Sequence, residues 1–231
     1  MIAILFLKLS TLLNLCFSYQ TINLKKTNNI VIREPINSET TSKFIYDLNL
    51  IEKKNSTYVY LNTPGGSVFE GIKIIEEIKK HNMSCIVENA YSMGFVIFQV
   101  CKNRYILPNG KLMQHQMSFG LHDEKKRIEN YIHFIDSVNK DLLQLQATRI
   151  NISNEEFTQK TDNEWWLYGN ESIKNNCADE IVNVECSKSL TKDTIIIERG
   201  NYKYTYSRCP LISNPIKKDK LKKKEFEFTF I

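Results

Sequence analysis

The chain has 231 residues, of which 42% are hydrophobic and 25% are charged, and its formal net charge is +5. This length predicts one domain of roughly 150–200 residues with extensions, and the apolar content is sufficient for a sizeable core. The positive excess is concentrated near the C-terminus, so the body of the chain has no basic groove of the kind that binds nucleic acid, and no nucleic-acid partner is expected.

The N-terminal segment differs from the rest of the chain. Residues 2–7 and 12–17 are strongly apolar, and Cys16 and Ser18 place small residues at the −3 and −1 positions of a cleavage site. We interpret residues 1–18 as a signal-peptide-like segment, which predicts the secretory pathway or an organelle lumen. A cytoplasmic protein with a buried N-terminal helix, or a signal anchor, stays open as an alternative, because no basic residue precedes the apolar run.

Six cysteines are present, and no two of them have the CxxC spacing of a zinc site, so neither a metal nor another cofactor is expected. Cys85 and Cys101 lie in apolar runs and are interpreted as inert core residues. Cys186 and Cys209 bracket a hairpin and could pair in an oxidising compartment.

Apolar runs and helical periodicity alternate along the body of the chain. The runs typical of short buried strands are residues 29–33, 58–61, 84–87, 104–107 and 181–182. A long amphipathic helix is expected over about residues 123–149, and Ser153 with Glu156 forms a capping box that opens the next helix. Pro108-Asn109-Gly110 is expected to be a turn. This alternation predicts an α/β domain with a largely parallel sheet, over residues 19–186.

The last part of the chain, residues 187–231, has a different pattern. Residues 194–206 read as a β-hairpin that turns at Gly200-Asn201. Residues 217–224 form a lysine-rich run, which we expect to be a solvated tail, with an anionic partner or a membrane surface as the alternative. The domain therefore carries a C-terminal extension made of a β-hairpin and a basic tail.

Ser92 lies between an apolar strand and an apolar run, in the stretch Asn89-Ala90-Tyr91-Ser92-Met93-Gly94. A serine on a tight turn from strand to helix has an exposed hydroxyl and faces backbone N–H groups, as nucleophiles do. An ordinary turn or helix cap explains the same pattern taken alone.

A second junction from strand to helix, Pro64-Gly65-Gly66-Ser67, also carries glycine. Two such junctions can direct backbone N–H groups at one point, where they would stabilise the negative charge that develops during acyl transfer. The alternative interpretation of the glycine pair is tight backbone geometry alone.

A serine nucleophile needs a base, and histidine is the residue that most often serves. His81, His122 and His133 lie on or near charged helical stretches, whereas His115 ends an apolar strand, where sites collect in α/β sheets. A structural role for His115 is the alternative. The residue pattern by itself does not select an orienting acid.

The motifs Asn62-Thr63-Pro64-Gly65-Gly66-Ser67-Val68, Ala90-Tyr91-Ser92-Met93-Gly94 and Leu107-Pro108-Asn109 with Met113-Gln114-His115-Gln116 occur in this order. They resemble the ordered motifs of the Clp protease proteolytic subunit (ClpP) family, and the similarity extends over about residues 30–184. The resemblance implies the ClpP/crotonase-like fold of repeated ββα units, a Ser-His-Asp triad and ring-shaped oligomers.

Position by position, the resemblance makes Ser92 the nucleophile and His115 the general base. It makes Gly66 and Met93 the residues whose N–H groups form the oxyanion hole.

The segment that holds the family's acid corresponds to residues 160–167 and places Glu164 at the position of the catalytic aspartate, with Asp162 as the alternative acid. Glutamate is one methylene longer than aspartate, so the backbone must retreat for the carboxylate to orient a histidine.

The chain departs from the family pattern at several positions and is identified as a divergent member. Tyr91 replaces a small residue before the serine, Met117 replaces a proline, and residues 187–231 have no counterpart in the family.

The resemblance implies a serine endopeptidase that hydrolyses peptides or unfolded proteins through an acyl-enzyme on Ser92. It also implies a homo- or hetero-oligomeric ring and an ATP-dependent unfoldase as a candidate partner. A ClpP-like structural or regulatory paralogue with impaired catalysis is the main alternative, and the departures at Tyr91, Met117 and Glu164 favour it. A crotonase-like acyl-CoA enzyme and a Ser-Lys peptidase of the signal-peptide-peptidase type are less favoured.

Overall fold

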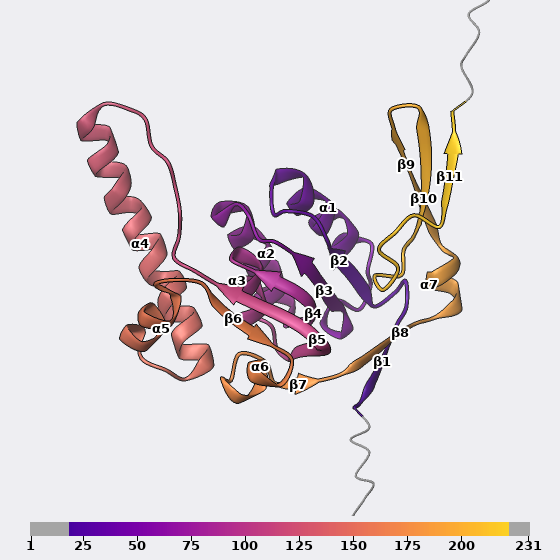
Figure 1. Cartoon of the computed structure of the whole chain (residues 1–231), viewed down its shortest axis with the longest axis horizontal. Helices are drawn as coiled ribbons and strands as arrows, with labels where there is room; N and C mark the ends of the chain where they lie inside the picture. Colours follow the sequence, from indigo (N-terminus) through magenta and orange to yellow (C-terminus); the bar gives the residue numbers. More distant parts are fainter. Residues whose placement is uncertain (1–18, 222–231) are drawn as a thin grey trace, which may run out of the picture.

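The computed structural model of the protein describes residues 19–221 (Figure 1). The signal-peptide-like segment and residues 222–231 lie outside the described residues. Within residues 19–221, no helix is both long enough and apolar enough to cross a membrane.

A six-stranded sheet forms the centre of the molecule, in the order β2-β3-β4-β5-β6, with β7 paired to β5. Its strands are β2 (Asn29–Ile32), β3 (Tyr58–Thr63), β4 (Ser84–Tyr91), β5 (Arg104–Gln114), β6 (Trp165–Tyr168) and β7 (Glu180–Ile181). Strands β2 to β5 are parallel, whereas β6 runs antiparallel to β5. The parallel arrangement brings the carboxyl ends of β3, β4 and β5 to one edge of the sheet, where the three motifs lie.

Each of the first three parallel strands is followed by a helix, which is the connection that parallel pairing requires. These helices are α1 (Ser38–Asn49), α2 (Val68–His81) and α3 (Met93–Gln99), and the later helices are α4 (Lys125–Ile150), α5 (Asn154–Thr161) and α6 (Asn170–Lys174). The long helix and the Ser153 cap expected from the sequence are both present, since the Ser153 side chain accepts a hydrogen bond from the Glu156 N–H.

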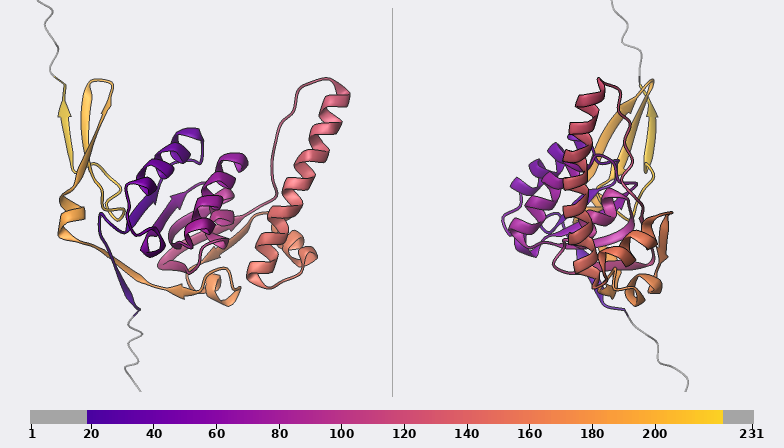
Figure 2. Two further views of the ribbon diagram at one scale, coloured as in Figure 1. Left: turned by 180° about the vertical axis from the view of Figure 1, so that it is seen from behind. Right: turned by 90° about the vertical axis from the view of Figure 1, so that its left-hand side faces the viewer.

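Helix α4 contacts the core mainly through its C-terminal half, where Ala147 and Ile150 are buried. Its N-terminal half extends beyond the sheet (Figure 2), and Tyr131 and Phe134 there are exposed.

Strands β3 and β4 are buried on both faces, so their side chains form two cores with the alternation of a β-strand. Val59, Leu61 and Val87 pack against the helices, and Tyr60 and Ile86 point to the other face. That face is covered by β1 (Thr21–Leu24), which pairs in parallel with β8 (Asn183–Cys186). The α/β class is confirmed, and the mixed sheet is consistent with the fold that the resemblance implies.

The turn expected at Pro108-Asn109-Gly110 is wrong, because these residues lie inside the continuous strand β5. The register with β4 changes there, from Val87 opposite Ile106 to Asn89 opposite Lys111. The extra residues form a bulge, where a proline that cannot donate a ladder hydrogen bond is tolerated.

Cys85 and Cys101 are buried in the core as expected, and they also form a disulfide with a Cα–Cα distance of 5.7 Å, which the sequence interpretation did not foresee. The short helix α3 returns the chain to the start of β4, which brings the two residues together. Cys186 and Cys209 also form a disulfide. Cys177 is a buried free thiol, and burial raises its pKa to about 12.

The C-terminal extension follows β8 and consists of α7 (Lys188–Lys192), β9 (Thr194–Arg199), β10 (Tyr202–Ser207) and β11 (Lys217–Lys220). The hairpin that turns at Gly200 is confirmed, and Gly200 has the positive φ (+57°) that such a turn requires. Lys217, Lys218 and Lys220 are solvent-exposed as expected, but residues 217–220 form a third strand on β10 and are not a tail. This sheet projects from the body (Figure 1).

Candidate active site

Ser92 occupies a strained turn between β4 and α3. Its backbone has φ +53° and ψ −120°, a conformation that non-glycine residues rarely adopt outside functional turns. Three backbone hydrogen bonds hold it there: the Ser92 N–H donates to the Met113 carbonyl at 2.8 Å, and the Ser92 carbonyl accepts from the N–H groups of Phe95 at 2.9 Å and Val96 at 3.3 Å. The turn therefore depends on the pairing of β4 with β5.

The glycine junction after β3 lies directly against this turn. A Cβ atom on Gly65 would come within 2.5 Å of the Tyr91 carbonyl oxygen, 2.8 Å of Ser92 Cβ and 2.9 Å of the Met93 nitrogen. Gly65 also has φ +90°, so a side chain there would be strained even without the collision.

The backbone N–H groups of Gly66 and Met93 have no hydrogen-bond acceptor within residues 19–221. Met93 is the first residue of α3, where an N–H has no partner inside the helix and the helix dipole is positive. Gly66 is held beside Ile36, whose carbonyl accepts from the Ser67 N–H at 2.8 Å. Two free donors beside Ser92 are what an oxyanion hole requires.

His115 follows the end of β5, and its Nε2 atom lies 2.9 Å from Ser92 Oγ. The pairing of Tyr91 with Met113 sets this position, since it aligns the ends of β4 and β5. With the proton on Nδ1, Nε2 accepts the hydrogen bond from the serine O–H, which is the arrangement that a general base needs. Both side chains are half-buried.

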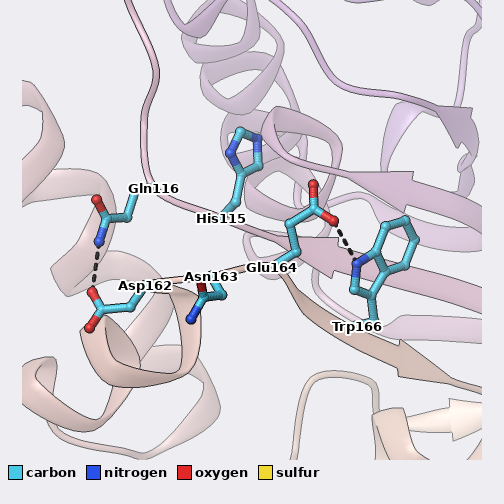
Figure 3. Close-up of a pocket in the computed structure, with 6 residues that line it drawn as sticks. All are labelled: His115, Gln116, Asp162, Asn163, Glu164 and Trp166. Carbon is cyan, nitrogen blue, oxygen red and sulfur yellow. Dashed lines mark hydrogen bonds between the residues drawn. The ribbon is translucent and has the colours of Figure 1, made fainter.

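An open pocket of about 570 Å³ is lined in part by His115 (Figure 3). It is lined by His115, Gln116, Asp162, Asn163, Glu164 and Trp166.

The pocket contains both candidate acids. Glu164 Oε2 accepts a hydrogen bond from Trp166 Nε1 at 2.9 Å, and Asp162 Oδ1 accepts from Gln116 Nε2 at 2.7 Å. Figure 3 shows the Asp162 side chain directed away from His115, whereas the Glu164 side chain points in the same direction as the His115 side chain.

The structure thus brings Ser92, His115, Gly66 and Met93 together, whereas neither acid is hydrogen-bonded to the histidine within the described residues. The assignment of Glu164 as the orienting acid stays a prediction.

The sequence interpretation missed the role of Trp166 beside the site. Its ring lies 5.2 Å from that of Tyr91, in an edge-to-face arrangement, while its indole N–H bonds Glu164. The bulky Tyr91 is thereby directed onto Trp166, and its hydroxyl donates to Asn89 Oδ1 at 3.0 Å. Burial, with a smaller effect of the Glu88 charge, raises the pKa of Tyr91. Alternation along β6, which buries one tryptophan and exposes the next, is the signal that could have indicated this contact.

A serine on a strained strand-to-helix turn, a histidine within hydrogen-bonding distance and free N–H groups from two junctions form the arrangement used by serine hydrolases. The model of the Clp protease family matches residues 17–185, and the chain belongs to this family.

Known proteins with similar sequences support this assignment. The ATP-dependent Clp protease proteolytic subunit of Lactococcus lactis subsp. cremoris (strain SK11) is 27% identical over 169 residues, which cover 69% of this chain and 85% of that protein. The protein of the same name from Streptococcus gordonii (strain Challis) is 27% identical over 170 residues, covering 69% of this chain and 86% of that protein.

Proposed function

We propose that the protein is a serine endopeptidase that cleaves peptide bonds through an acyl-enzyme on Ser92. The observation that carries the proposal is the 2.9 Å contact between Ser92 Oγ and His115 Nε2, next to the free N–H groups of Gly66 and Met93. Membership of the Clp protease family supports the reaction class.

In the first half of the reaction, His115 Nε2 takes the proton of the Ser92 hydroxyl as Oγ attacks the scissile carbonyl carbon. The carbonyl oxygen becomes an oxyanion, and the N–H groups of Gly66 and Met93 donate hydrogen bonds to it. When the tetrahedral intermediate collapses, His115 returns the proton to the leaving amine, and the acyl group stays on Ser92.

In the second half, a water molecule attacks the acyl carbon while His115 takes one proton from it, and the new oxyanion binds at the same two N–H groups. Collapse breaks the bond to Ser92 Oγ, His115 returns the proton to Oγ, and the carboxylic acid leaves.

We propose Glu164 as the acid that accepts a hydrogen bond from His115 Nδ1–H. This requires the carboxylate to leave Trp166 Nε1 and turn within the shared pocket. The segment that carries Glu164 is exposed, so a substrate or another subunit can contact it. A partner that binds more tightly when Glu164 faces His115 shifts the carboxylate toward that orientation, by the difference between its two binding free energies. Asp162 is the alternative acid.

We also propose a ring-shaped oligomer that acts on peptides or unfolded proteins, with an ATP-dependent unfoldase as partner. The family and the names of the relatives support this assembly. The secretory pathway or an organelle lumen is the proposed location, because disulfides are rare in cytoplasmic proteins and this chain has two. A cytoplasmic location is the alternative.

Labelling with a fluorophosphonate probe tests the activity. We expect the assembled protein to be labelled, the Ser92→Ala variant to be unlabelled, and Ser118→Ala, which changes an exposed serine near the site, to be labelled as the parent is. If the assembled parent is not labelled, the proposal fails. The protein would then be a structural or regulatory paralogue, an interpretation that the hydrogen bond between Glu164 and Trp166 favours.

A further inference from the structure

The three-stranded sheet β9-β10-β11 has two faces of different chemistry. In an antiparallel sheet, residues directly opposite one another point to the same side, and neighbours along a strand alternate. Tyr204 pairs with Ile197 on one side and Lys218 on the other, and Tyr202 pairs in the same way with Arg199 and Lys220. These six residues therefore share one face.

We call this surface the tyrosine–lysine face. It carries Tyr202, Tyr204, Tyr206, Arg199, Lys218 and Lys220. No acidic residue of the three strands lies on it, so its formal charge is +3.

The opposite face carries both acidic residues of the three strands. Glu198 and Asp219 lie there beside Lys203 and Lys217, and Lys217 Nζ forms an ion pair with Asp219 at 2.9 Å. The two acidic and two basic residues give this face a formal charge of zero. The effect of removing positive charge can therefore be compared between the two faces of one sheet.

The tyrosine–lysine face is most open to solvent near the hairpin turn. Arg199, Tyr202, Lys218 and Lys220 are exposed there, whereas Tyr204, Tyr206, Ile195 and Ile197 are half-buried. The Lys218 ammonium lies 4.1 Å from the centre of the Tyr202 ring and 5.5 Å from that of Tyr204. It therefore covers the ring faces on which a nucleic-acid base would have to stack.

The sequence around this face adds to its charge. Residues 187–231 contain eleven Lys and Arg and five Asp and Glu, whereas the whole chain contains 31 and 26. The net positive charge of the protein thus comes from this extension. The sequence continues past β11 with three lysines at 222–224 and phenylalanines at 226, 228 and 230.

We propose that the tyrosine–lysine face binds the surface of an anionic lipid bilayer. Tyrosine rings combine an apolar body with a polar hydroxyl, which suits the boundary between head groups and acyl chains. Lysine and arginine side chains extend apolar stems toward the same boundary while their charges attract acidic head groups. Ile195 and Ile197 add aliphatic area between the tyrosines. The catalytic residues take no part, so this inference stands apart from the proposed peptidase activity.

Cosedimentation of the full chain with vesicles tests the proposal. Vesicles of phosphatidylcholine with phosphatidylserine should bind the protein, and vesicles of phosphatidylcholine alone should not. The double variant Lys218→Gln/Lys220→Gln should bind about thirtyfold more weakly, since each lysine near an anionic surface strengthens binding by about fivefold. The matched control Lys203→Gln/Lys217→Gln loses the same charge from the opposite face and should bind as the parent does.

Thermal melting of both double variants checks that they fold. The single variant Arg199→Gln, at the end of the hairpin, should weaken binding to anionic vesicles by a smaller factor than the double variant Lys218→Gln/Lys220→Gln does. Equal weakening by the two double variants would show that net charge alone matters and would overturn the proposal. So would a lack of binding to the anionic vesicles, equal binding to neutral vesicles, or tighter binding of a single-stranded oligonucleotide or polyglutamate with the same dependence on Lys218 and Lys220.

Discussion

The two sides of the candidate active site are built differently. On the nucleophile side, Ser92 and His115 follow the buried strands β4 and β5, and the backbone hydrogen bond from Ser92 to Met113 fixes one strand end against the other. On the acid side, Glu164 and Asp162 lie on an exposed segment between α5 and β6, and each carboxylate bonds a side chain other than His115.

This difference shows which parts of the candidate site the fold itself determines. Strand pairing places the backbone of a residue and leaves its side chain few choices, as at Ser92. An exposed carboxylate can bond any of several nearby donors, and each such hydrogen bond contributes only about 1 kcal/mol to stability. Its orientation can therefore change when a ligand or another subunit binds. We therefore expect perturbations on the nucleophile side to act through stability and geometry, and perturbations on the acid side to act on catalysis alone.

Replacement of Glu164 gives the largest expected effect on the reaction. If Glu164 orients His115 in the working enzyme, Glu164→Gln should lower kcat by up to about 10⁴-fold, because an amide in place of the acid favours the wrong histidine tautomer. Peptide hydrolysis by the assembled protein measures this effect, and the melting temperature should stay close to that of the parent.

Asp162→Asn is the matched control, since it removes the same charge from the same segment. Its kcat should fall far less. The reverse order of the two variants would transfer the acid role to Asp162, and an unchanged kcat in both would remove the acid from the proposed mechanism.

Arg104 secures the start of β5, the strand whose end positions His115. Its side chain is 1% exposed, and it donates to Asp179 at 2.6 Å and to Gln99 at 2.6 Å. Arg104→Met removes the donor from the buried side-chain oxygen of Gln99 and the nearest ion-pair partner from the partly exposed Asp179, so it should lower the free energy of unfolding by about 3 kcal/mol. Urea unfolding measures this loss.

Arg149 provides the comparison for Arg104, because it bonds the same Asp179 at 3.3 Å but its side chain is 36% exposed. Arg149→Met should cost about 1 kcal/mol or less, as exposed ion pairs do. Equal losses in the two variants would contradict the claim that burial at the start of β5 holds the nucleophile side in place.

Gly65→Ala tests the packing of the glycine junction against the serine turn. The new methyl group would collide with the Tyr91 carbonyl and push the junction away from Ser92. Displacement of one oxyanion donor corresponds to a loss in kcat of about 10²–10³-fold. Gly120→Ala is the control, because nothing lies within 4 Å of its added methyl group. Peptide hydrolysis at equal levels of folded protein distinguishes them, and similar activity of both variants would refute the role of Gly65.

The sequence was sufficient to predict that Ser92 and His115 lie side by side. Glycines at two junctions and a histidine after a strand are local signals, and the α/β alternation predicts that the strand ends meet. The sequence could not predict that the Glu164 carboxylate bonds Trp166 and not His115, because this depends on where the competing side-chain donors lie in space.

Two further features escaped prediction for a related reason. The disulfide of Cys85 and Cys101 depends on how far α3 returns the chain, which an apolar run does not indicate. Strand β11 is made of lysines and an aspartate, residues with weak β propensity, so it is recognised only from its pairing with β10. The loop between the two strands is linked to Cys186 of β8 by the disulfide with Cys209.

Acidification should weaken the nucleophile side through Asp179. Burial alone would raise the pKa of this carboxyl, but the hydrogen bonds and charge of Arg104, with the charge of Arg149, together lower it below its usual range. A carboxyl whose pKa is lower in the folded state contributes its full stabilisation above the unfolded pKa of about 3.9, and this contribution is lost as the pH falls through the folded value.

Urea unfolding of the parent and of Asp179→Asn, measured from about pH 6 down to about pH 3, isolates this contribution. The variant should be less stable at pH 6 and should lose less stability on acidification, because it cannot take up the proton at residue 179. The carboxyls of Glu70 and Glu155, whose pKa values are also lowered, are common to both proteins and cancel in the difference. Parallel curves would show that Asp179 is not the group that links β5 to pH.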